Sequence, residues 1–182
     1  MALKAINMEK YFKKGSVYIL LTLLFACNSA ATISSRNIYF DDISTKNEIS
    51  DQDFNSIDRI LFAFINSLHQ KKPNSLLRLI SMEDGIYIDL KAHLSYNEFN
   101  QQLTNKNSYV MKLFFTGSRE NGIQIKPIRE ILQNQNIVYD IFFYSKAECE
   151  IYLETEQGEK LFELTPPILR KKKGRWYLTR SF

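Results

Sequence analysis

This chain of 182 residues has few of the residues that recognisable catalytic and metal sites need: 2 histidines, 2 cysteines and 6 glycines. The histidines, His69 and His93, lack the short spacing to each other or to a cysteine that metal ligands usually show. No G-x-S-x-G turn and no glycine-rich phosphate loop is present. The sequence therefore predicts no metal site, no cofactor and no hydrolase motif.

Long apolar runs are also scarce. The stretch Val17–Ala26 is well short of the roughly 20 residues that a membrane-spanning helix needs, so a transmembrane anchor is not expected. Lysines precede this stretch in the segment MEKYFKK, and small residues follow it. That order is the layout of a secretory signal, which we place at residues 1–26. Met8 gives a more typical leader than Met1, and translation starts at one of the two.

The end of the apolar stretch, Leu24-Phe25-Ala26-Cys27, resembles the lipobox of bacterial lipoproteins. That motif places a leucine three residues before the lipid-bearing cysteine and a small residue directly before it. Phe25 departs from the pattern, because the commoner lipoboxes have a small residue there. The resemblance implies acyl chains such as palmitate on Cys27, and two or three chains hold a protein on a bilayer durably. The alternative is an ordinary leader that is cut near residues 29–31.

Lipidation of Cys27 would anchor the protein in the bacterial cell envelope. Asn28 stands where an aspartate would favour retention at the inner membrane, so we expect the outer membrane or the cell surface. The membrane is then one partner, and a protein or a small-molecule ligand is the other.

The charge distribution disfavours a nucleic-acid partner. The net charge is +4, but four of the 24 basic side chains and one of the 20 acidic ones lie before Cys27. The remaining chain is nearly neutral. Binding to a phosphate polymer draws on many uncompensated Lys and Arg side chains, so we expect no nucleic-acid binding.

The two cysteines are not expected to form a disulfide, because a lipidated Cys27 has no free sulfur to pair with Cys149. Glu148 and Glu150 flank Cys149 and would raise the pKa of its thiol, which disfavours a thiolate nucleophile. We expect Cys149 to be a small apolar core residue.

A single α+β domain is expected over residues 50–182, after a flexible tether over residues 27–49 that is rich in Ser, Thr, Asn and Asp. Ser50 and Asp53 form a capping-box pattern at the start of the strongest predicted helix. Its apolar residues recur every three or four positions as far as Leu68, and Pro73 ends the run.

The rest of the domain alternates between helical and strand periods. Ser95 and Glu98 give a second capping box. Residues 109–115 fit either a helix or a buried strand. The expected elements are a short helix over 74–80, a strand over 86–90, a helix from 96, a helical turn over 127–132, strands over 137–144, 147–154 and 160–164, a turn over 171–174 and a closing strand over 175–182.

This element order, with the closing Gly174-Arg175-Trp176-Tyr177-Leu178, resembles the cone fold of the nuclear transport factor 2-like superfamily. The resemblance covers about residues 50–182 and implies N-terminal helices packed on a curved antiparallel sheet. Another helix-on-sheet arrangement remains the alternative. Period two predicts that Trp176 and Leu178 face the core while Tyr177 and Thr179 face away.

Asp89 and His93 are the one pair with catalytic potential, because in a cone-shaped fold they could face a pocket as an orienting acid and a general base. The competing interpretation is an exposed loop histidine. No other catalytic constellation is visible, so we expect a binding protein and not an enzyme. The alternative is an envelope enzyme that uses Asp89 and His93.

A basic cluster over residues 170–175 is the other candidate site. Arg170, Lys171, Lys172, Lys173 and Arg175 could dock on anionic lipid headgroups or on an acidic partner. The competing interpretation is a solvated hairpin tip whose lysines protect a sheet edge.

Overall fold

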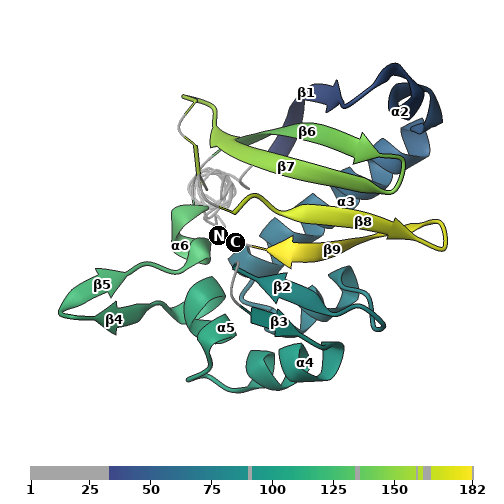
Figure 1. The fold of residues 1–182 in the computed structure, drawn as a ribbon. Coiled ribbons are helices and arrows are strands. Elements are labelled where there is room, and N and C mark those ends of the chain that lie inside the picture. The colour runs from purple at the N-terminus through teal and green to yellow at the C-terminus, as the bar shows by residue number, and fades with distance from the viewer. Residues whose placement is uncertain (1–32, 90–91, 134–135, 159, 162–164, 182) are drawn as a thin grey trace, which may run out of the picture. The chain divides into compact units, whose positions relative to one another are not determined.

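A computed structural model describes residues 33–181, apart from 90–91, 134–135, 159 and 162–164 (Figure 1). Cys27, the predicted leader and the first residues of the predicted tether lie outside the described residues, as does most of the strand expected over 160–164. None of the described helices is both long enough and apolar enough to cross a lipid bilayer.

A seven-stranded sheet runs through the domain in the order β1-β6-β7-β8-β9-β2-β3. Most neighbouring strands are antiparallel, whereas β1 pairs with β6 and β2 pairs with β9 in parallel. The strands are β1 Ile33–Phe40, β2 Ile86–Ile88, β3 Ala92–Leu94, β6 Ile137–Ser145, β7 Glu148–Thr155, β8 Ile168–Lys172 and β9 Arg175–Ser181.

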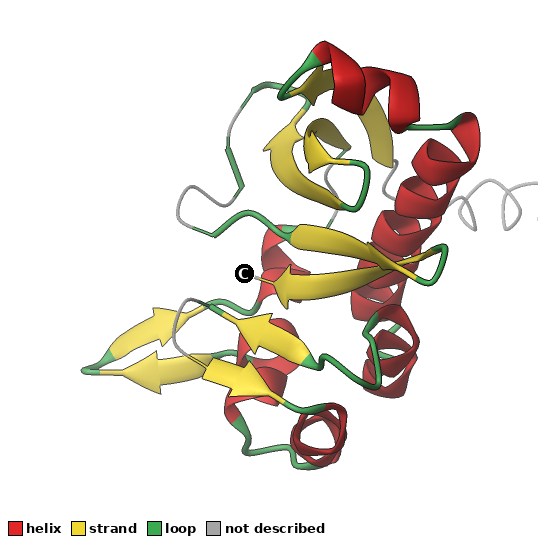
Figure 2. Ribbon diagram, turned by 45° about the vertical axis from the view of Figure 1, so that its right-hand side comes forward, coloured by secondary structure: helices red, strands yellow, loops and turns green. Residues whose placement is uncertain are grey.

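The long helix α3, Asp51–His69, lies behind the central strands (Figures 1 and 2). It begins as predicted, because the Ser50 hydroxyl accepts from the Asp53 backbone N–H and the Asp53 carboxylate accepts from the Ser50 backbone N–H. Its apolar face buries Ile57, Leu61 and Leu68 among others. The α+β class, with helices packed on one face of a curved and mostly antiparallel sheet, is confirmed.

The start of the domain was predicted incorrectly. Part of the expected tether forms the edge strand β1 and the short helix α2, Ile43–Glu48. An edge strand leaves most of its side chains in solvent, and the β1–β6 register shifts between Ser35 and Asn37. Both effects remove the alternation of apolar residues by which a strand is recognised.

The helices expected in the middle of the chain are present, and the segment left open between helix and strand is helical. The segment expected as a short helix over 74–80 is a 3-10 helix, η1, Pro73–Leu79, and the second capping box starts α4, Tyr96–Thr104. The ambiguous segment 109–115 is helical. The remaining elements are α5 Tyr109–Met111, the π-helical turn η2 Lys112–Thr116, α6 Ile128–Ile131 and an unpredicted hairpin of β4 Ser118–Glu120 and β5 Ile123–Ile125.

The closing strand β9 has the predicted orientation. Trp176 and Leu178 are buried, at 2% and 4% exposure, whereas Tyr177 and Thr179 are only partly covered. Trp176 packs edge-on against Phe143 of β6 at a ring distance of 6.1 Å. The aromatic core therefore joins the last strand to the first long hairpin.

Candidate functional site

In the described part of the interior, side chains of α3 pack closely against those of β7 and β9. A pocket there, lined by apolar residues and Ser181, has a volume of about 10 Å³. A buried water needs about 10–15 Å³ together with polar partners. This pocket therefore has no room for a small-molecule ligand, whereas a pocket of about 280 Å³ is lined by residues of α3, β1 and β6.

Asp89 and His93 lie on the β2–β3 hairpin. The His93 side chain is exposed, its ring is 4.6 Å from that of Tyr87, and its Nε2 donates to the Asp84 carbonyl oxygen at 2.7 Å. Asp89 has a positive φ of 55°, and its backbone N–H donates to the Ser181 carbonyl at 3.0 Å. The structure thus places His93 on the solvent side of the hairpin and not in the interior.

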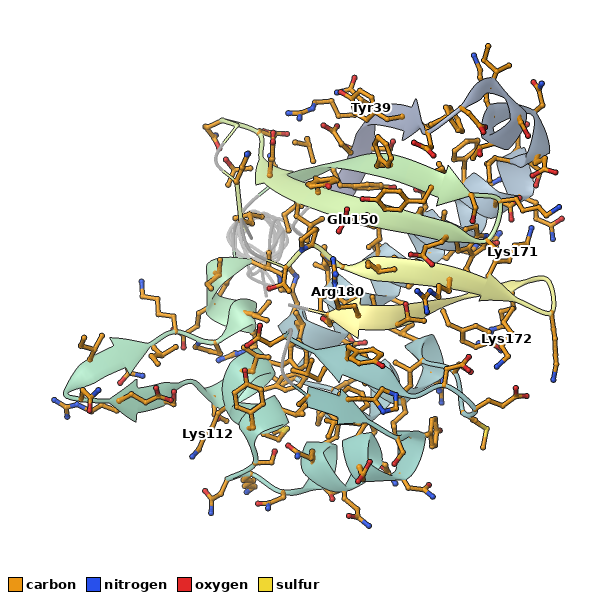
Figure 3. The ribbon with its side chains drawn as sticks, viewed as in Figure 1. Tyr39, Lys112, Glu150, Lys171, Lys172 and Arg180 are labelled. Atoms are coloured by element: carbon orange, nitrogen blue, oxygen red, sulfur yellow. The ribbon has the colours of Figure 1, made fainter. Side chains whose placement is uncertain are left out.

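The basic cluster lies on the β8–β9 hairpin. The turn is formed by Lys173 and Gly174, whose φ angles of 50° and 79° suit a two-residue hairpin turn. Lys171 and Lys172, which were expected in the turn, belong to β8. Both strands lie inside the sheet order, but β2 pairs with β9 only at Arg180 and Ser181, far from the turn. Figure 3 shows Lys171 and Lys172 on this hairpin.

Lys171 makes a structural contact with α3. Its Nζ lies 2.6 Å from Oδ1 of Asp53, and Trp176 Nε1 donates to the same oxygen at 2.8 Å. The Ser50 hydroxyl donates to the other oxygen at 2.8 Å. Burial alone would raise the pKa of Asp53, but Lys171, Trp176 and Ser50 outweigh it and lower that pKa to about 2. Lys171 is therefore occupied by an internal carboxylate.

Three other cations of the cluster also contact carboxylates. Arg170 Nε lies 2.7 Å from Glu148, Lys172 Nζ lies 2.8 Å from both Glu83 and Asp84, and Lys173 Nζ lies 2.9 Å from Glu83. Hydrogen bonds from Lys172 and Lys173 lower the pKa of Glu83 to about 2, so Glu83 stays ionised at neutral pH. Most of the predicted basic cluster is therefore already neutralised.

Arg175 is different, because its partners are uncharged. Its Nη2 donates to the Arg78 carbonyl at 3.3 Å, and its guanidinium lies 5.1 Å from the centre of the Tyr177 ring. Arg78 and Arg175 together line two open surface pockets. These two arginines thus line both pockets beside the β8–β9 hairpin.

We name the two pockets by their linings. The hairpin pocket, about 440 Å³, lies beside the β8–β9 turn and is lined by Leu77, Arg78, Ile80, Ser81, Met82, Glu83, Tyr96, Lys172, Lys173, Arg175 and Tyr177. The arginine pocket, about 410 Å³, lies between α3, η1 and the same hairpin and is lined by Ser56, Arg59, Ile60, Arg78, Leu79, Gly174, Arg175 and Trp176. Both volumes fall in the usual range for small-molecule sites.

A second polar cluster lies on the face of the sheet that points away from α3 (Figure 3). The sequence did not reveal it. Glu150 is 8% exposed and accepts hydrogen bonds from Arg180 Nη2 at 2.6 Å, Tyr144 at 2.5 Å and Tyr152 at 2.8 Å. Figure 3 shows Glu150 and Arg180 pointing toward one another from β7 and β9. The donors come from β6, β7 and β9, so the cluster holds three strands together.

The hydrogen bonds to Glu150 change the acidity of both tyrosines. The bond to this carboxylate raises the pKa of Tyr144, and burial together with the same carboxylate raises that of Tyr152. Glu148 and Glu154 of the same strand are partly exposed, whereas Glu150 is buried. Only the pairing of β6, β7, β8 and β9 brings Arg180 and the tyrosines over Glu150.

Cys149 is fully buried, and burial raises the pKa of its thiol. The prediction of a small core residue is therefore confirmed. In the described part of the chain, no group of three or more His, Cys, Asp or Glu side chains is arranged to hold a metal ion.

No protein-family profile matches the sequence, and no curated protein is significantly similar to it. Solved structures with partial similarity include a protein of unknown function with a cystatin-like fold from Nostoc punctiforme, with a TM-score of 0.41, 18% identity and coverage of 72% of this chain and 90% of that one. Another is a protein from Novosphingobium aromaticivorans, proposed to be a scytalone dehydratase, with a TM-score of 0.37, 12% identity and coverage of 71% of this chain and 80% of that one.

Proposed function

We propose that this protein is a lipid-anchored lipoprotein of the bacterial cell envelope whose α+β domain binds a ligand at its surface and has no catalytic activity of its own. The binding site is the pair of pockets around Arg78 and Arg175. The observation that carries this proposal is the size of the two open pockets at the β8–β9 hairpin, compared with the small pocket between α3 and strands β7 and β9.

The anchor rests on the leader and on Leu24–Cys27. Domain residues begin at Ile33, so only a short segment separates Cys27 from the edge strand β1. We also assign the domain to the nuclear transport factor 2-like superfamily. The order of α3, η1, α4 and the sheet, together with the buried Trp176 on the closing strand, supports that assignment.

Intact mass of the protein from the membrane fraction tests the anchor. We expect a mature chain that begins at Cys27 and carries added acyl mass. The Cys27→Ala variant should move from the detergent phase to the aqueous phase on phase separation, whereas Cys149→Ala should not. A mature chain that begins near residues 29–31 would show an ordinary cleaved leader instead.

A thermal-shift screen of small molecules tests the binding site. We expect ligands whose stabilising effect is lost in Arg78→Ala, because Arg78 lines both pockets. Arg119→Ala is the matched control, since Arg119 is an exposed arginine on β4 that lines neither pocket. Ligands that stabilise the Arg78 variant and the parent protein equally would place the binding site elsewhere.

The absence of catalysis is tested with a panel of ester, glycoside, peptide and phosphate substrates. We expect no turnover, because His93 is exposed and its Nε2 already donates to a backbone carbonyl. Turnover that disappears in His93→Ala would overturn the binding proposal in favour of an envelope enzyme.

A further inference from the structure

The arginine pocket is lined by three arginines from elements that are far apart in the sequence. Arg59 comes from α3, Arg78 from the last turn of η1 and Arg175 from the start of β9. All three side chains are exposed, and the residues that line the pocket include no Asp or Glu. Across the described ranges between residues 33 and 181, no ion pair involves any of the three.

The three lysines near this pocket differ from its three arginines, because each lysine is paired with a carboxylate. Lys171, Lys172 and Lys173 each lie within 3 Å of a carboxylate oxygen. Arg175 is held by the Arg78 carbonyl and the Tyr177 ring, and these contacts orient its guanidinium without neutralising it. Three like charges on one pocket repel each other. An anion in the pocket would relieve that repulsion.

We infer that the arginine pocket binds a phosphate monoester. A phosphate monoester carries close to two negative charges at neutral pH and has three terminal oxygens that accept hydrogen bonds. It can therefore engage Arg59, Arg78 and Arg175 together. A carboxylate has one charge and two oxygens, which a single guanidinium can match in a fork. Three arginines thus favour the phosphate group. This inference rests on the proposed binding function of the same surface.

The lining of the two pockets indicates where the rest of the ligand lies. The volume of about 410 Å³ exceeds what a lone phosphate group fills, and Ile60 and Leu79 offer apolar contact to an organic group. In the hairpin pocket, Lys172 and Lys173 are already paired with Glu83 and Asp84, whereas the arginine pocket has three arginines and no carboxylate in its lining. The phosphate therefore belongs in the arginine pocket, and the hairpin pocket suits an uncharged part.

A phosphate monoester can be carried by a lipid headgroup or by a soluble molecule, and the experiment separates these sources. The full chain is reconstituted in phosphatidylcholine vesicles, and glycerol 3-phosphate is titrated while the fluorescence of Trp176 is recorded. Trp176 is the single tryptophan and lines the pocket, so it is a local reporter. Dimethyl phosphate, with one charge, and acetate serve as comparison anions at equal ionic strength.

We expect saturable binding of glycerol 3-phosphate, with weaker or no binding of dimethyl phosphate and acetate. Arg59→Gln and Arg175→Gln should each raise the Kd about tenfold or more, because each removes charge-assisted hydrogen bonds. Arg119→Gln should leave the Kd unchanged. The affinity should fall as pH decreases through about 6, where the phosphate takes up a proton.

Vesicles that also contain phosphatidic acid show whether the phosphate monoester comes from a lipid headgroup or from a soluble molecule. If the lipid headgroup fills the pocket, they raise the apparent Kd of glycerol 3-phosphate, and Arg59→Gln removes that competition. If they leave the Kd unchanged, the ligand is soluble. Equal binding of all three anions, or binding that survives in both arginine variants, would overturn the inference. Small molecules that depend on Arg78 but not on Arg59 would then still support the proposed binding function.

Discussion

The Trp176 indole donates a 2.8 Å hydrogen bond to Oδ1 of Asp53, and this bond joins the closing strand to the capping box of α3. Asp53 was recognisable in the sequence as part of a capping box, and Trp176 as a core residue. Their contact couples the two ends of the domain. Two of the following predictions depend on it.

Replacing Trp176 tests the packing of β9. Trp176→Ala should lower the free energy of unfolding by about 3–5 kcal/mol, because it empties a large buried aromatic site. Trp176→Phe keeps most of the volume but removes the indole N–H, and should cost about 1–3 kcal/mol through the loss of one hydrogen bond to a buried carboxylate. Urea unfolding followed by circular dichroism measures both. Tyr177→Phe, at a partly exposed neighbour, is the control, and a loss there as large as in Trp176→Phe would contradict the assignment.

The depressed pKa of Asp53 predicts a loss of stability in acid. The pKa of Asp53 is about 2 in the folded state, below its ordinary value of 3.8. The ionised carboxylate therefore stabilises the fold fully at pH values above 3.8, and this stabilisation is lost as the pH falls toward 2. The expected contribution is about 2 kcal/mol. Unfolding measured between pH 5 and pH 2 should show this loss in the parent protein and a weaker one in Asp53→Asn.

Asp53→Asn should itself cost roughly 3 kcal/mol at neutral pH, because it leaves Lys171 without its partner and weakens the helix cap. Asp51→Asn is the matched control, since Asp51 lies exposed in the same first turn. An equal acid response in both variants would show that Asp53 is not the group responsible.

The Glu150 cluster predicts a change in tyrosine ionisation. Glu150→Gln removes the negative charge that opposes deprotonation of Tyr144 and Tyr152, so the pKa of each should fall. Tyr144 should change more, because its hydrogen bond to Glu150 is the leading cause of its raised pKa, whereas burial leads for Tyr152. Spectrophotometric titration with Tyr144→Phe and Tyr152→Phe identifies each transition. Glu148→Gln, on the same strand, should change neither.

The buried position of Cys149 predicts that its thiol reacts only after the protein unfolds. Its side chain is fully buried, and burial raises the pKa of the thiol, so little thiolate forms and reagents cannot reach it. In the Cys27→Ala chain, Cys149 is the single thiol, and its modification by a disulfide reagent should follow the unfolding rate in urea. Fast modification in the absence of urea would contradict the buried position.

Sequence patterns predicted the helices and strands that are stabilised by contacts between residues close together in the chain. Ser50 and Asp53, and again Ser95 and Glu98, satisfy helix amides within a few residues, so both helix starts could be predicted. Period two along β9 placed Trp176 and Leu178 in the core before any partner strand was known. The edge strand β1 was not predicted, because its exposed side chains and its register shift leave no regular alternation of apolar residues in the sequence.

The candidate site depends on contacts that local patterns do not contain. The sequence by itself determined that a basic cluster occupies residues 170–175, but it could not say which of those cations already have partners. Glu83, Asp84 and Asp53 come from distant segments, and tertiary packing alone brings them to Lys171, Lys172 and Lys173. The same packing places Arg59, Arg78 and Arg175 around one pocket. Charges interact through space, so the order of residues along the chain does not show which cations have a partner.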